Sequence, residues 1–281
     1  MKKVTENKNP NKKYLTETGF FKNGLPFTRV GNKKNIMVDI EALSFKHEPA
    51  SGFMLRNFIK SHRLLAEEYA VFLIGRRPNL PQDYLMDKMA EDYAEVIREK
   101  FKRPVDVMGI STGGQIAQYL AADHPDTIRK LVIISAAYRL SKRGVELERQ
   151  SENYFKQEKY GKSMAVMMDF SLLPGLKRSM FKFFMQLIAG RMMGDIEYPN
   201  DFLVEVRADR EMNFINRLKD IKAPTLIMSG ELDIGYTIDD VRATAEGIPD
   251  ARLILYKGYG HNLTFSNMEQ VQKDMLKFLR K

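Results

Sequence analysis

The chain has 281 residues, of which 44% are hydrophobic and 29% are charged, and this composition excludes a largely disordered protein. The formal charge of +9 would favour anionic partners, but Lys and Arg alternate with Asp and Glu along the chain. Because no basic stripe carries interleaved aromatic residues, we expect no nucleic-acid partner. The absence of cysteine excludes disulfides, a thiolate nucleophile and a Cys-based zinc site.

Residues 1–13 are polar and rich in Lys and Asn, which predicts a flexible arm. The basic start of this segment is not followed by the apolar stretch of a signal peptide. No later run approaches the roughly 18 uncharged apolar residues of a membrane span. We therefore expect a cytoplasmic protein without a membrane span.

The chain then alternates between predicted strands and predicted helices. Residues 14–30 hold two strand-like pieces around the turn signal Lys22-Asn23-Gly24, which indicates a hairpin at a sheet edge. Short apolar runs predict buried strands at 36–40, 70–74, 105–108, 131–135, 225–229 and 253–256. Apolar spacings of three and four predict helices at 55–67, 85–101, 114–122, 239–246 and 268–279. This alternation predicts an α/β fold with a mostly parallel, doubly wound sheet.

One segment interrupts the alternation. Residues 141–218 contain no convincing strand and form a helical stretch rich in Met and Phe. We interpret this stretch as a helical cap inserted into an α/β core that comprises residues 14–140 and 219–281.

A glycine-flanked serine follows the predicted strand at 105–108 and precedes a predicted helix. The sequence Gly109-Ile110-Ser111-Thr112-Gly113 has the Gly-x-Ser-x-Gly pattern of a nucleophile elbow. Glycine is needed on both sides because the tight turn brings these backbone positions too close for a side chain. The helix N-terminus beyond the serine favours developing negative charge. Ser111 is therefore the candidate nucleophile.

A serine nucleophile needs an imidazole base, which in turn needs a carboxylate to orient it. Among the four histidines, His62 is interpreted as part of a charged helical face and His124 as a helix-end residue. His261 follows the last predicted strand in a glycine-rich loop, and it is the candidate base. Asp233 follows the strand at 225–229 and is the preferred acid, with Glu231 as its rival.

With Ser111, Asp233 and His261 in this order, the sequence resembles the α/β-hydrolase superfamily over nearly its whole length after residue 14. The segments 121–133 and 221–227 are similar to the esterase-type branch, in which a helical cap follows the sixth strand. The resemblance implies a serine hydrolase that cleaves a carboxylic ester or related acyl substrate through an acyl-enzyme. It implies no cofactor and no metal.

The resemblance also implies an oxyanion hole made of two backbone N–H groups, those of Ala42 and Thr112. Members of the branch usually carry a His-Gly pair after the third strand, whereas Glu41 stands in place of the glycine here. A carboxylate beside an oxyanion would disfavour the negative intermediate. Two interpretations stay open: an active esterase, or a weakly catalytic or non-catalytic sensor that binds a small molecule in the same pocket.

Two neighbouring features bear on the substrate. Arg76 and Arg77, in the loop after the fourth predicted strand, are interpreted as structural ion-pair partners, with a clamp for an acidic substrate as the alternative. The Met and Phe residues of the cap suit a small or medium apolar acyl or ester substrate. The competing interpretation is that they only pack the cap onto the core or onto a second subunit, as in a homodimer.

Overall fold

The computed structural model describes residues 3–6, 14–193 and 196–281. Most of the segment 1–13, for which a flexible arm is predicted, lies outside these residues. Its described part, Lys3–Glu6, forms strand β1 and pairs with β2 in antiparallel orientation.

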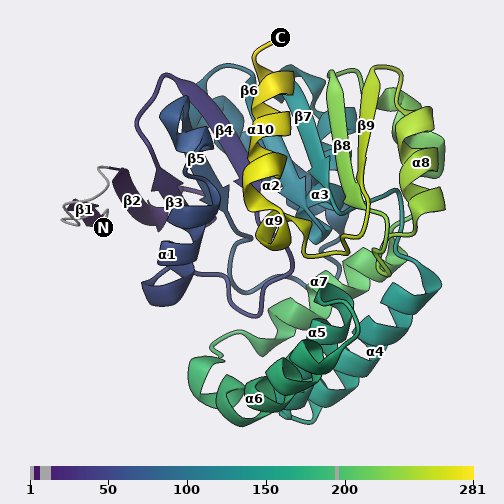
Figure 1. Cartoon of the computed structure of the whole chain (residues 1–281). Coiled ribbons are helices and arrows are strands. Elements are labelled where there is room, and N and C mark those ends of the chain that lie inside the picture. The colour runs from purple at the N-terminus through teal and green to yellow at the C-terminus, as the bar shows by residue number, and fades with distance from the viewer. Residues whose placement is uncertain (1–2, 7–13, 194–195) are drawn as a thin grey trace.

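Nine described strands form a single sheet in the order β1-β2-β3-β5-β4-β6-β7-β8-β9 (Figure 1). Pairing is antiparallel from β1 to β5 and parallel from β5 through β9. The strands after β1 are Leu15–Phe20 (β2), Pro26–Val30 (β3), Asn35–Ile40 (β4), Tyr69–Ile74 (β5), Val105–Ile110 (β6), Ile128–Ile134 (β7), Thr225–Gly230 (β8) and Ala251–Tyr256 (β9). The predicted mostly parallel sheet and its antiparallel edge hairpin are thus confirmed.

Helices cover both faces of the sheet, as the nearly continuous apolar strands require. Apolar side chains of α2 (Met86–Val96), α3 (Thr112–Asp123) and α8 (Ile238–Gly247) pack into one core. Those of α1 (Gly52–Ser61) and α10 (Met268–Leu279) pack into the other core. Short helical turns lie between these elements at Leu65–Glu67 (η1), Ile97–Phe101 (η2), Pro125–Thr127 (η3), Ile215–Asp220 (η4) and Leu263–Ser266 (α9).

The predicted cap consists of helices that the chain forms between β7 and β8. They are α4 (Lys142–Lys156), α5 (Tyr160–Ser171), α6 (Leu176–Met193) and α7 (Pro199–Glu211). Figure 1 shows them gathered below the sheet, on the side where the chain leaves β7. Ser141 begins α4 and joins it to the core, because its hydroxyl accepts from the Gly144 N–H and donates to the Ile234 carbonyl.

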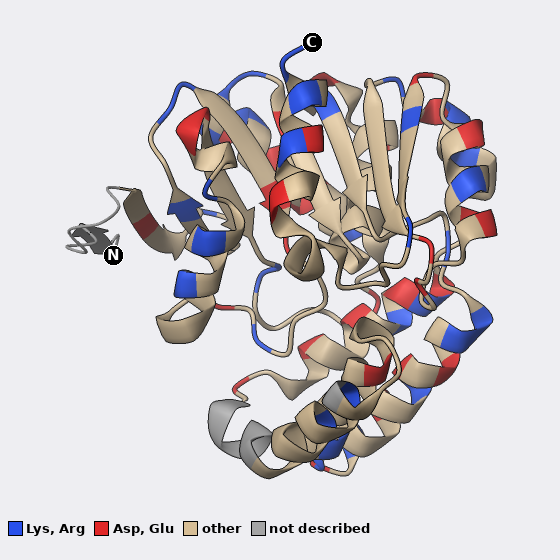
Figure 2. Cartoon of the chain, in the orientation of Figure 1, with Lys and Arg blue, Asp and Glu red and all other residues tan. Residues whose placement is uncertain are grey.

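Charged residues of both signs are spread along the core and the cap (Figure 2). No helix in the described part of the chain is long and apolar enough to cross a bilayer.

Candidate active site

Ser111 stands at the turn between β6 and α3, in a backbone conformation with φ 56° and ψ −126°. Positive φ is costly for a residue with a side chain and persists only where the surroundings enforce it. A Cβ atom at position 109 would lie 2.2 Å from the Gly113 carbonyl oxygen, and one at position 113 would lie 2.1 Å from the Ile40 carbonyl oxygen. Both positions therefore require glycine, because α3 approaches the ends of β4 and β6 too closely for a side chain.

The structure brings the three candidate catalytic side chains together. The His261 Nε2 atom lies 3.1 Å from Ser111 Oγ, and its Nδ1 atom lies 2.9 Å from an oxygen of Asp233. With Nδ1–H donating to the carboxylate, Nε2 is free to accept the serine proton. This is the geometry that a general base and its orienting acid require.

Two loops at the carboxyl ends of β8 and β9 deliver the acid and the base. The Leu232 N–H donates to the Tyr259 carbonyl, and a Cβ at Gly230 would collide with the same carbonyl oxygen at 2.3 Å. Asp233 is fixed further because its other oxygen accepts the N–H groups of Gly235 and Tyr236. Asp233, and not its rival Glu231, is the residue that contacts His261.

Two aromatic rings hold the imidazole of His261. Phe170 at the end of α5 contacts it edge-on at 4.5 Å, and the buried Tyr236 stacks on it at 5.8 Å. The cap therefore supplies one wall of the site directly. The interpretation of His62 as a surface residue is wrong, because His62 is buried and its Nε2 atom lies 3.0 Å from the Asp39 carboxylate.

The expected oxyanion donors lie on two segments that meet at the elbow. Thr112 is the first residue of α3, and a helix leaves the N–H groups of its first turn without internal partners. Ala42 follows β4, and Arg76 holds this loop because its guanidinium donates to the carbonyls of both Glu41 and Ala42. Arg76 thus fixes the orientation of the peptide units around the Ala42 N–H.

Glu41 lies on the side of this loop away from the elbow. Gly113 faces the carbonyl oxygens of Ile40 and Glu41, whereas the Glu41 carboxylate lies against Gly75. Burial raises the pKa of Glu41 to about 7, against the opposing effect of the Arg76 cation. The carboxylate expected to disturb the oxyanion therefore lies against the residue that follows β5.

The sequence interpretation missed a row of buried carboxylates on α7 of the cap. Asp201, Glu205 and Asp209 recur every four residues and are all buried, so they share the helix face that meets the core. Asp201 accepts from the N–H groups of Asn79 and Leu80 at 2.9 and 2.7 Å. Their spacing was the only sequence signal, and acidic residues at this spacing usually form a solvated helix face.

Glu205 is the centre of a buried ion-pair network between cap and core. Its two oxygens contact Arg76 and His47, and His47 also lies 3.3 Å from Asp201. Burial alone would lower the pKa of His47, but the two carboxylates outweigh it and raise the pKa to about 9. The interpretation of Arg76 and Arg77 as structural ion-pair partners is confirmed, since Arg77 lies 3.5 Å from Asp92.

Asp209 lies directly beside the nucleophile elbow. It accepts a hydrogen bond from the Thr112 hydroxyl at 2.5 Å, and the Tyr236 hydroxyl lies 3.5 Å from its other oxygen. Burial raises the pKa of Asp209 to about 6 and holds the pKa of its neighbour Glu148 well above the usual range. The Asp209 carboxylate disfavours ionisation of Glu148, and this repulsion adds to the effect of burial on the pKa of Glu148.

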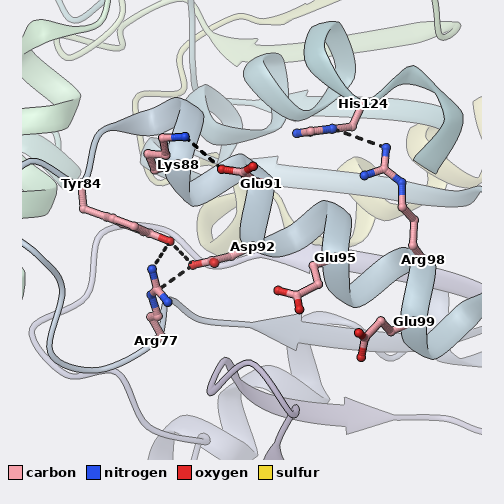
Figure 3. Close-up of a pocket in the computed structure, with 9 residues that line it drawn as sticks. All are labelled: Arg77, Tyr84, Lys88, Glu91, Asp92, Glu95, Arg98, Glu99 and His124. Carbon is pink, nitrogen blue, oxygen red and sulfur yellow. Dashed lines mark hydrogen bonds and ion pairs between the residues drawn. The ribbon is translucent and has the colours of Figure 1, made fainter.

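A separate surface pocket lies along α2, away from these residues (Figure 3). Two ion pairs join lining residues, Lys88 with Glu91 at 3.1 Å and Arg77 with Asp92 at 3.5 Å. The lining residues are Arg77, Tyr84, Lys88, Glu91, Asp92, Glu95, Arg98, Glu99 and His124. No cluster suited to a metal ion occurs among the described His, Asp and Glu residues.

Comparison with known proteins places this geometry in context. Residues 52–267 match the family described as alpha/beta hydrolase fold. The bifunctional esterase/perhydrolase DCH of Acinetobacter calcoaceticus is 27% identical over 73% of this chain and 78% of its own length. A non-heme haloperoxidase of Rhodococcus erythropolis is also 27% identical, with the same shares covered. A hydrolase structure from Pseudomonas aeruginosa PA01 aligns with a TM-score of 0.73 at 16% identity, over 94% of this chain and 98% of that one.

Proposed function

The chain belongs to the α/β hydrolase fold family and is a hydrolase, and we propose that it is a serine esterase that works through an acyl-enzyme. In this proposal Ser111 is the nucleophile, His261 the general base and Asp233 the orienting acid. The observation that carries the proposal is the chain of contacts Asp233–His261–Ser111, at 2.9 and 3.1 Å. Such a chain is what a weakly nucleophilic hydroxyl needs in order to react.

The proposed reaction has two halves. Ser111 Oγ attacks the ester carbonyl carbon while His261 Nε2 takes the hydroxyl proton, and the resulting oxyanion accepts the N–H groups of Ala42 and Thr112. The intermediate collapses when the carbon–oxygen bond to the alcohol breaks, and the alcohol leaves with the proton from His261. A water molecule, activated by His261, then attacks the acyl carbon. The bond between this carbon and Ser111 Oγ breaks, the carboxylic acid leaves, and Ser111 regains its proton from His261.

The proposed substrate is a small or medium apolar carboxylic ester or a related acyl compound. Two apolar cap side chains support this class: Phe170 lies on His261, and Leu173 lies beside Gly260, which precedes that histidine. Relatives named as an esterase/perhydrolase and as a monoacylglycerol lipase agree with an acyl substrate. A sensor role rested on Glu41, and the position of its carboxylate against Gly75 favours the enzyme instead.

Hydrolysis of p-nitrophenyl esters tests the proposal. We expect turnover that Ser111→Ala and His261→Ala each lower by about 10⁴-fold or more, because the two side chains act as a unit. The melting temperature of both variants should stay close to that of the wild type. Wild-type rates retained by a folded Ser111→Ala variant would refute the proposed nucleophile.

The same assay tests the substrate class. Rates should rise from acetate toward butyrate or octanoate, because a longer apolar acyl chain gains contact with the apolar wall of the site. A steady fall with chain length would refute the apolar substrate while leaving the proposed triad intact.

A further inference from the structure

Cap helix α6 presents a continuous apolar stripe to solvent. Its members are between 53% and 77% exposed and recur at spacings of three and four residues: Leu176, Met180, Phe183, Phe184 and Leu187. Isolated exposed apolar residues are normal on a protein surface. A contiguous row over three helical turns is not, and such rows mark interaction sites.

The opposite face of α6 fixes this orientation by packing on α5. Met185 is buried, and a Cβ at Gly161 of α5 would lie 2.5 Å from the Gln186 carbonyl oxygen. Lys182 and Arg178 both contact Asp169, the last acidic residue of α5. Because these contacts occupy one side of the helix, the stripe on the other side points away from the protein.

The segment that carries the stripe is also basic. Between Asp169 and Asp195 the sequence contains no acidic residue and four basic ones, which are Lys177, Arg178, Lys182 and Arg191. Arg178 and Lys182 share Asp169 on the side that packs on α5, and the segment 169–194 keeps a net charge of +3. An exposed apolar face on a segment with a net positive charge is typical of helices that lie in the interface of an anionic bilayer.

The stripe begins close to the candidate active site. Leu173, three residues before α6, is partly exposed and lies against Gly260 beside His261. Leu232, in the loop after β8, and Phe265, in α9, are also exposed. A surface that covered the start of α6 would therefore lie close to the loop that carries His261.

We propose that the exposed face of α6 docks on an anionic lipid bilayer, so that the enzyme draws its apolar ester from the membrane surface. That the ester comes from the membrane rests on the proposed esterase function. Docking itself can be measured without any turnover. The apolar stripe supplies insertion between lipid headgroups, and the basic surplus supplies attraction to anionic lipid.

Vesicle co-sedimentation tests the docking. Wild-type protein should bind phosphatidylcholine vesicles that contain about 25% phosphatidylglycerol, and bind pure phosphatidylcholine vesicles much less, with salt weakening the difference. Phe183→Ser/Phe184→Ser should weaken binding by about tenfold or more, because both rings are more than half exposed and insertion of each is favourable. Leu176→Ser/Leu187→Ser is a second variant at the two ends of the stripe and should act in the same direction.

The matched control is Phe20→Ser/Ile215→Ser, which removes two exposed apolar side chains that lie outside α6. This variant should bind vesicles like the wild type. Hydrolysis of a water-soluble ester should be unchanged in Phe183→Ser/Phe184→Ser, because these rings face solvent. Vesicle binding by a wild type that cleaves no ester would refute the esterase and leave the docking standing. Wild-type protein that ignores anionic vesicles, or a dimer that only the α6 variants dissociate, would overturn the docking.

Discussion

Removal of the Arg76 guanidinium should lower both the stability and the activity of the protein, and a second substitution should restore only the stability. Arg76 is fully buried, pairs with Glu205 and donates to the carbonyls of Glu41 and Ala42. Arg76→Met leaves the Glu205 carboxylate buried with only His47 beside it, and breaking a buried pair costs about 3–5 kcal/mol. For a chain of this size that loss corresponds to a melting temperature lower by about 10 °C.

The double variant Arg76→Met/Glu205→Gln should recover much of this loss, because neither charge then stays buried alone. Its activity should not recover. The carbonyls of Glu41 and Ala42 remain unheld, and misplacement of one oxyanion donor lowers kcat by about 10- to 1,000-fold. Glu205→Gln alone keeps both Arg76–carbonyl bonds and should retain more activity than either variant without Arg76.

The assay combines thermal unfolding with p-nitrophenyl ester kinetics on the four proteins of this cycle. We expect the double variant to be more stable than the sum of the two single effects predicts. Its kcat should show no such recovery. If the double variant regained activity in proportion to its stability, Arg76 would be a purely structural ion-pair partner. The account of the Ala42 N–H would then be wrong.

Three further variants test neighbouring residues. The raised pKa of Glu41, about 7, means that its contribution to stability is complete at low pH and is lost as the pH rises through 7. Glu41→Gln should therefore flatten the fall of melting temperature between about pH 4.5 and 7, and an unchanged profile would contradict the burial of this carboxyl. Asp209→Ala should lower kcat by about tenfold or more while Asp209→Asn retains most of it, because an amide oxygen can still accept from Thr112; equal kinetics of both variants would exclude a positioning role. Asp233→Asn should lower kcat by about 10⁴-fold and Glu231→Gln far less, and the reverse order would overturn the acid assignment.

The fold and the central geometry follow from local patterns that one sequence displays. The elbow is foreseeable because all of its constraints fall within five residues, and Gly109 and Gly113 mark positions where a side chain would collide with backbone. Asp233 and His261 are foreseeable because each follows a strand, and parallel strands bring their carboxyl ends to one edge of the sheet. The expected burial of the strand at 253–256 was wrong, because β9 is the edge strand and is mostly only partly buried.

The network behind the oxyanion loop was not foreseeable in the same way. It joins Arg76, His47 and Glu205 across separations of 129 and 158 residues, and no local pattern specifies such pairings. An acidic row on a helix has the appearance of a solvated face, and only the packing of α7 against the core buries it. Phe183 and Phe184 are the opposite case, since these apolar residues are exposed. The apolar composition of a cap helix does not tell which of its sides faces the protein.

Labelling with a fluorophosphonate probe tests the central claim most directly, because the probe reacts with a serine only when its hydroxyl is activated. The account predicts stoichiometric labelling that maps to the Ser111 peptide, is lost in Ser111→Ala and is strongly slowed in His261→Ala. A folded wild-type protein whose Ser111 stays unlabelled would contradict it.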